Sequence, residues 1–295
     1  MLAAKIQQVT GERPPSVSSV RQKFLRKPTF WIGALIVLGF LLFCFLGPIL
    51  DPSSPLTSHP GAFGQPPSLK WPLGTDDIGR NEMIRLMYGG RLMLLIGLLS
   101  AIISTTLGFW VGVLSGFYGG LVDRLLSWTM DIVTSVPQLV PLLLFEVLVG
   151  ASPTTMIVVV SLTSWPFVGR PVRAEVMSLS TREFIMAAGS LGASRRRIIV
   201  RHLLPNLWST LLTTVTSSFG TAILVIATAS FLGFSLPAPN PNWGSMIAHG
   251  IHVIYDGYWW LWVLPTAFLI LLQLAVHFMA VAARESLNSQ SEVAS

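Results

Sequence analysis

The chain has 295 residues, of which 52% are apolar and only 11% are charged, and its mean hydropathy is +0.66. Soluble domains carry about 25% charged residues, so this composition excludes a soluble enzyme and a nucleic-acid-binding module. The net charge of +6 fits the basic cytoplasmic loops of membrane proteins and requires no nucleic acid as partner. The single cysteine, Cys44, excludes an internal disulfide and a cysteine-based metal cluster.

Six apolar stretches are long enough to cross the roughly 30 Å hydrocarbon core of a membrane, which takes about 20 helical residues. They are predicted at 30–50, 89–115, 123–149, 154–172, 206–232 and 259–283. A cleaved signal peptide would resemble the first stretch, but its apolar core would be only about 7–15 residues long. Prolines 237, 239 and 241 cannot continue the fifth helix. The sequence therefore predicts an all-α integral membrane protein with six transmembrane helices.

The basic residues orient these helices. With six spans, 15 of the 19 lysines and arginines fall on the side that holds the N-terminus, and positive charge marks the cytoplasmic side. We expect a cytoplasmic segment at 1–29, a first helix at 30–50, an extracytoplasmic loop at 51–88, a five-helix core at 89–283 and a cytoplasmic tail at 284–295. The core includes a cytoplasmic loop at 173–205 and an extracytoplasmic loop at 233–258.

The cytoplasmic loop is the most informative stretch. Thr181 is predicted to cap a short helix that carries Phe184, Ala187 and Ala188 on one face, and Gly192 permits a sharp turn after it. A second amphipathic segment with four arginines follows, and a proline at 205 opens the fifth span. Small side chains suit docking into a groove on a partner, and an amphipathic segment also suits an anionic lipid surface. Both interpretations remain open at this point.

Residues 22–285 resemble the permease subunits of bacterial ABC importers, of the dipeptide and oligopeptide (OppC/DppC) type. The block 181–194 resembles the EAA loop of that family. Further matching motifs, in the same order and spacing, are Leu73–Arg80, Met130 with Asp131, Pro137, Phe231–Phe234 and Trp243–Ile247. The chain departs from the family at Met186, where a glutamate is usual, and at Asn81, where an aspartate is usual. Glu183 lies one helical turn before Met186 and either replaces that carboxylate or is an ordinary solvated charge.

The resemblance implies a type I ABC importer permease fold with a cytoplasmic coupling helix. It also implies ATP-driven uptake of di- and oligopeptides across the bacterial inner membrane, with both termini in the cytoplasm. The implied partners are a second homologous permease, two ABC ATPase subunits and an extracytoplasmic substrate-binding protein, besides membrane lipid and the peptide substrate. The chain itself would bind no cofactor, since ATP and Mg belong to the partner ATPase subunits. The residues implied to couple to the ATPases are Glu183, Phe184, Met186, Ala187, Ala188, Gly189, Leu191, Gly192, Ala193 and Arg195.

Several polar residues fall inside the predicted spans, where ionisable groups are rare and often mark a pathway. Asp131, like Pro137, is interpreted as structural, as the partner of an arginine or of a helix end. Glu146 either faces a translocation cavity, where it would meet the amino terminus of a substrate, or reaches the outer headgroups. Gln273 and His277, four residues apart, either line a cavity or hydrogen-bond between helices. Glycines at 97, 108, 112 and 116 predict close helix packing.

Other functions need features that this sequence lacks or only partly supplies. No phosphate-cradling loop, nucleophile elbow or His-Glu-x-x-His motif occurs, so we expect no enzyme activity, and ATP hydrolysis would belong to another subunit. His249 and His252 have a helical metal-ligand spacing but no further clustered ligands, so no metal site is expected. Within the family, nickel, metal chelates or antimicrobial peptides are alternative substrates. An ion-coupled secondary transporter is a further alternative, although such folds often contain internal repeats and none is seen.

Overall fold

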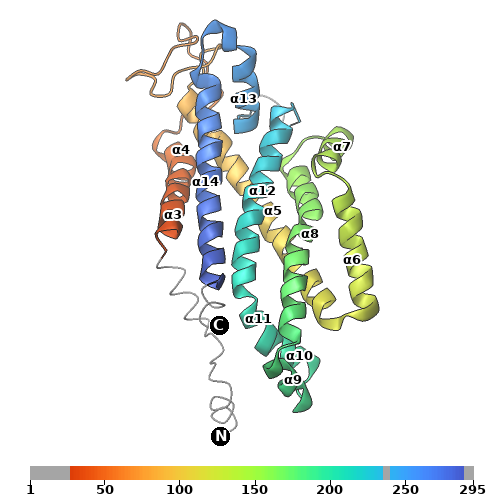
Figure 1. Ribbon diagram of the computed structural model, residues 1–295. Coiled ribbons are helices and arrows are strands. Elements are labelled where there is room, and N and C mark those ends of the chain that lie inside the picture. The colour runs from red at the N-terminus through yellow and green to blue at the C-terminus, as the bar shows by residue number, and fades with distance from the viewer. Residues whose placement is uncertain (1–26, 235–239, 289–295) are drawn as a thin grey trace.

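The computed structural model describes residues 27–234 and 240–288, and this part of the chain folds into a bundle of long helices (Figure 1). The first span is one continuous rod made of α3 (Pro28–Leu41), a π-helical turn η1 (Leu42–Leu46) and α4 (Gly47–Leu50). The other long helices are α5 (Glu82–Tyr118), α8 (Pro153–Ser180), α12 (Trp208–Phe231) and α14 (Trp260–Asn288). Each of these five is long and apolar enough to cross a membrane. The predicted all-α fold is thereby confirmed.

The third predicted helix, 123–149, is two helices. α6 (Gly120–Ser135) and α7 (Leu139–Val149) meet at an angle of 74°. The break falls at Val136, which is extended because it precedes Pro137, and a proline disfavours the helical conformation of the residue before it. The prediction of one continuous helix at 123–149 is therefore wrong, although α6 and α7 together still pass as one broken span.

Two other helices extend by seven or more residues beyond a predicted end. α5 begins at Glu82 instead of 89, because the side chain of Asn81 caps it by accepting a hydrogen bond from the amide of Met83 at 3.0 Å. α8 continues to Ser180, about 12 Å beyond the predicted end at 172, at 1.5 Å per residue. Short helices also fill the loops: α9 (Glu183–Ser190) and α10 (Arg195–Ile198) lie at one end of the bundle, and α13 (Trp243–His252) lies at the other (Figure 1).

Helix packing is closest between α5 and α8. A Cβ atom added to Gly112 would come within 2.6 Å of the carbonyl oxygen of Gly169, and Gly108 and Gly116 meet the backbone of α8 in the same way. The predicted close packing at these glycines is confirmed. Towards the α13 end, the buried ring of Trp243 packs with Phe40 and Phe268, and its indole nitrogen donates a hydrogen bond to the carbonyl of Leu86 at 2.8 Å.

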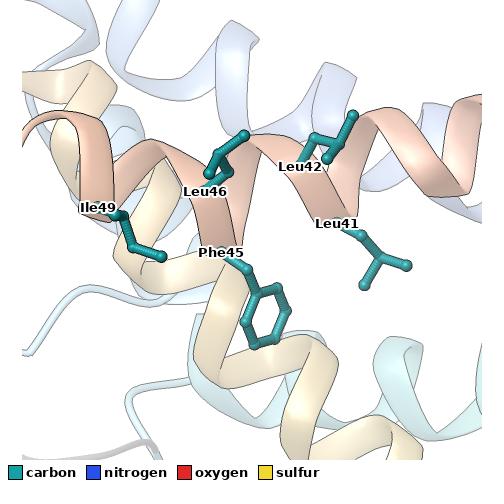
Figure 2. Close-up of a pocket in the computed structure, with 5 residues that line it drawn as sticks. All are labelled: Leu41, Leu42, Phe45, Leu46 and Ile49. Carbon is teal, nitrogen blue, oxygen red and sulfur yellow. The ribbon is translucent and has the colours of Figure 1, made fainter.

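The outer side of the first span is apolar. Figure 2 shows the side chains that border a shallow groove of about 440 Å³ on this helix, namely Leu41, Leu42, Phe45, Leu46 and Ile49. All five are hydrocarbon side chains that project from the rod, and the opposite side of the rod packs on α14 (Figure 1). This surface matches the apolar exterior of a transmembrane helix in lipid.

Candidate functional site

The segment 183–203, hereafter the 183–203 element, comprises α9, α10 and a π-helical turn η2 (Ile199–Leu203). It packs on the ends of α5 and α8 through three buried apolar side chains. Ile185 is only 5% exposed, and Ile198 and Leu203 are also buried, in a cluster with Val176 and Leu179 of α8. Sequence reasoning did not identify Ile185 as an anchor, because Phe184 and Met186 beside it on α9 are also large and apolar and only the packing distinguishes them.

The outward face of the 183–203 element carries exposed apolar side chains beside charged ones. Met186 is 54% exposed and Leu191 is 73% exposed. Of the residues implied to couple to an ATPase, Glu183, Phe184, Met186, Ala187, Gly189, Leu191, Gly192 and Arg195 are exposed, and Ala188 and Ala193 are partly buried. Eight of the ten predicted residues are therefore accessible, on an element that Ile185, Ile198 and Leu203 anchor to the bundle.

The turn within the element depends on glycine. Gly192 has a φ of +80°, which L side chains rarely adopt, and the amide of Ala193 donates to the carbonyl of Ala188 at 3.1 Å across the turn. The predicted cap of α9 is wrong, because α8 continues to Ser180 and Thr181 closes that helix. The hydroxyl of Thr181 donates to the carbonyl of Ser178, and α9 starts after Arg182 without a side-chain cap.

Ion pairs tie α6 to α8 near the 183–203 element. Arg173 donates to both carboxylate oxygens of Asp123, at 2.5 and 2.7 Å, and the hydroxyl of Ser115 on α5 also donates to Asp123. Closer to the break in the third span, Arg170 donates to Asp131 at 2.8 Å. The predicted arginine partner of Asp131 is thus present. The bidentate pair of Asp123 with Arg173 was not predicted, although the two opposite charges lie at the ends of neighbouring predicted spans.

The polar residues proposed for a path are not gathered at one point. Glu146 lies on α7, which packs on α8 and α12, and it is only 5% exposed. Gln273 lies on α14 beside Gly220 of α12, and His277 is exposed one turn further along α14. Pro137 forms the break between α6 and α7. In the conformation described, the carboxyl group of Glu146 is closed off within its own chain and does not face an open cavity.

The opposite end of the bundle is closed by the motif Leu73–Arg80. The buried carboxylate of Asp76 accepts hydrogen bonds from the backbone and the side chain of Arg80, at 2.7 and 2.6 Å. Asp77 bonds to His249 of α13 at 2.8 Å, and the indole of Trp260 on α14 donates to the carbonyl of Thr75. The motif therefore fixes the loop before α5 to α13 and α14. Among the described residues, no group of three or more histidines, cysteines and carboxylates could hold a metal ion.

The fold and the 183–203 element define a class: a multi-span helical protein with the fold of ABC importer permeases. Two solved structures share this fold. An inward-facing structure of the MetNI methionine ABC transporter matches with a TM-score of 0.57 and 22% identity, over 68% of this chain and 96% of that chain. An amino acid ABC transporter with histidines matches with a TM-score of 0.53 and 17% identity, over 68% of this chain and 94% of that chain.

The chain belongs to the family of binding-protein-dependent transport system inner membrane components, whose model matches residues 104–286. Residues 17–67 match the N-terminal transmembrane domain of oligopeptide transport permease C. It is therefore a multi-pass protein of the inner membrane, and the predicted family is confirmed.

Curated relatives cover most of the chain. The dipeptide transport system permease protein DppC of Alkalihalophilus pseudofirmus is 33% identical over 87% of this chain and 84% of its own length. A putative peptide permease protein of Brucella suis biovar 1 is 33% identical over 89% of this chain and 87% of its own length. The oligopeptide transport system permease protein OppC of Bacillus subtilis is 30% identical over 87% of this chain and 84% of its own length.

Proposed function

We propose that this chain is a transmembrane permease subunit of an ATP-driven importer of di- and oligopeptides. The observation that carries this proposal is the similarity of nearly nine-tenths of the chain to dipeptide and oligopeptide permeases. The exposed apolar face of the 183–203 element supports it, because a permease needs a surface on which an ATPase can act. Nickel, metal chelates, antimicrobial peptides and ion-coupled transport are less well supported, because these relatives are named for peptides.

The assembly that we propose contains a second homologous permease, two ABC ATPase subunits and an extracytoplasmic binding protein. ATP and Mg belong to the ATPases, and this chain performs no catalysis. The 183–203 element and both termini face the cytoplasm, since the exposed arginines at 195, 196, 197 and 201 follow the positive-inside rule. The binding protein then meets the opposite end of the bundle, where α13 and the Leu73–Arg80 motif lie (Figure 1).

The contacts in the structure provide a route for the mechanical step. An ATPase that moves α9 moves Ile185, which is packed in one cluster with Val176 and Leu179 of α8. α8 cannot slide freely on α5, because Gly112 brings their backbones together, and it carries α6 with it through Arg173. The expected motion is therefore a rigid-body rotation of these helices, which would switch the side to which the cavity between two permeases opens.

The path between the two permeases is proposed to include Glu146, Gln273 and His277. His277 is exposed on α14 and is available to a path or to the second permease, while Glu146 becomes available only after a movement of α7. On the element proposed to meet the ATPase, Glu183 supplies the carboxylate that Met186 lacks; the exposure of both residues, one helical turn apart, supports this role.

The proposal is tested by purifying the tagged chain from its native membrane, identifying its partners by mass spectrometry and measuring vanadate-sensitive ATPase activity. We expect a second permease and ATPase subunits with the wild-type chain. Gly192→Trp should lose the ATPases, because it strains the turn and adds bulk to the docking face. Gly61→Trp is a matched control, since Gly61 also has a positive φ and open space but lies in the loop at the α13 end. Peptide uptake that continues without an active ATPase would instead support an ion-coupled transporter.

A further inference from the structure

Glu146 is an unusual residue for its position. It lies within the broken third span and is 95% buried, and neither carboxylate oxygen has a hydrogen-bond partner among the described residues. It follows Leu142 by one helical turn, and Leu142 is fully buried in a cluster that contains Met156 of α8 and Ile226 of α12. An ionised carboxylate without a donor is strongly disfavoured in such surroundings. A leucine would fit this stripe of α7 better, so packing does not explain the glutamate.

The helix that carries Glu146, α7, begins and ends at breaks in the helical backbone. At its start, the extended Val136 and Pro137 interrupt the helical backbone and set the 74° bend to α6. At its end, Gly150 adopts a φ of +98°, and Ser152 begins α8 by capping the amide of Thr155 at 3.1 Å. α7 is therefore one unit of 11 residues between two breaks in the helical backbone, and the side chain of Gln138 at the first break donates to the hydroxyl of Ser164 on α8 at 3.2 Å.

α7 is buried along one side only, where Leu139 and Leu143 pack against the cluster that contains Leu142. Only a narrow stripe of the helix is buried, at Leu142 and Glu146, and its other faces are exposed or partly exposed. The face with Pro141 and Phe145 does not close on α8, and an apolar groove of about 350 Å³ lies between the two helices. α7 therefore has both the backbone breaks and the space that it needs to roll and carry Glu146 out of the buried cluster.

We propose that Glu146 binds the α-ammonium group of the peptide substrate, and that α7 opens this site during the transport cycle. The inference rests on the proposed function and deepens it by naming the substrate group. A carboxylate only accepts hydrogen bonds, and an ammonium group offers three N–H donors. A lone carboxylate does not suit a divalent metal ion, which takes several oxygen ligands. When α7 has turned, the carboxylate of Glu146 accepts hydrogen bonds from the ammonium group of the peptide, a donor that it lacks within the chain. Binding of the peptide's amino terminus therefore stabilises the open arrangement of α7.

The first test measures ATP-driven uptake of dialanine in proteoliposomes with the full transporter and its binding protein. We expect Glu146→Gln and Glu146→Leu to lower uptake about 10- to 100-fold, the usual effect of losing a charge-assisted hydrogen bond. Both variants should assemble normally, and Glu146→Leu should melt at the same or a higher temperature, because a buried unpaired carboxyl is replaced by an apolar group. Glu146→Asp should retain most uptake, and the neighbouring exposed Val147→Ala is the matched control.

The outcomes separate binding from packing. Wild-type uptake by Glu146→Gln or Glu146→Leu would overturn the proposal. So would a loss of assembly and melting temperature in parallel with uptake, because that result assigns Glu146 a structural role. N-formyl dialanine lacks the ammonium group, so the ratio of wild-type to Glu146→Gln uptake should fall to about one for this peptide. An equal loss for both peptides would mean that the carboxylate pairs with a cation other than the substrate's terminus.

A second test examines the movement of α7. Glu146→Cys should resist a water-soluble thiol reagent in the resting complex and react in the vanadate-trapped complex. Leu69→Cys, at a fully exposed position in the loop before α5, should react in both states, and the native Cys44 is buried and should stay silent. If Glu146→Cys never reacts, the site does not open and the proposal is wrong. If vesicles with the wild-type transporter accumulate no peptide, the proposed function also fails. If these vesicles accumulate peptide and the Glu146 variants accumulate as much, only the present inference fails.

Discussion

Ile185→Ala tests whether the 183–203 element transmits force through its buried anchor. The substitution removes most of a side chain that is almost fully enclosed by Val176, Leu179 and other apolar residues. Replacing a buried isoleucine by alanine lowers the free energy of unfolding by about 2–5 kcal/mol. The lower part of that range, about 2–3 kcal/mol, applies here because neighbouring side chains at the edge of the bundle can partly fill the cavity. Since 1.4 kcal/mol changes an equilibrium constant tenfold, the state in which α9 is detached from α8 should become about 30- to 150-fold more populated.

Hydrogen exchange of the α9 amides measures this population directly, and peptide uptake measures its consequence. The amide of Leu191, which donates to the carbonyl of Ala187 at 3.0 Å, should exchange faster by the same factor, while amides in the middle of α8 should not change. ATP-driven uptake should fall although the chain still inserts and the ATPases still hydrolyse ATP. Unchanged exchange in α9 would refute the assignment of Ile185 as the anchor.

Phe184→Ala is the matched control on the neighbouring residue. Phe184 is exposed on the outward face of the element, so its loss should leave exchange in α9 unchanged and weaken the recovery of ATPase subunits. The two variants thereby distinguish the side of α9 that holds the helix in place from the side that meets the partner. Identical behaviour of both variants would contradict that division.

Three further predictions concern the bundle. Gly112→Leu should prevent the close contact of α5 with α8 and strongly lower the melting temperature of the chain. Gly39→Leu, whose side chain would meet open space, should leave the melting temperature unchanged. Asp123→Asn should destabilise the bundle by about 1–2 kcal/mol, since the pair is partly exposed, and the reversed pair Asp123→Arg with Arg173→Asp should restore part of the loss. Trp243→Phe should cost about 1–2 kcal/mol in unfolding measurements through the lost indole hydrogen bond.

The long helices could be located from the sequence because hydropathy decides them. The regions at 30–50, 154–172, 206–232 and 259–283 all contain or overlap a long helix of the structure, since crossing a membrane leaves few alternatives to a helix. Helix ends were less predictable. The first turn of α5 carries Glu82 and Arg85, which are buried near Asp76, and a count of charges places such residues outside the helix.

The candidate site was only partly predictable for a different reason. The exposed residues of the 183–203 element could be identified from a local motif. Ile185 and the Asp123–Arg173 pair depend on contacts between segments far apart in the chain, which no local pattern contains. For Glu146, hydropathy could say that a charge lies inside a span, but not whether its side chain points to a path or into the protein.

The glycine contacts and ion pairs within this subunit join some of its helices more firmly than others. α5, α6 and α8 are joined by glycine contacts and by the pair of Asp123 with Arg173, so a push on α9 displaces them together. α7 has neither kind of connection and is flanked by Pro137 and Gly150, and only the hydrogen bonds of Gln138 and one buried stripe join it to its neighbours, so it can turn if these contacts release. A displacement that starts at the 183–203 element can therefore reach Glu146 as a change in the surroundings of α7, without any deformation of the long helices. The residue that is costly to bury thus lies on the one segment of the broken span that is free to expose it.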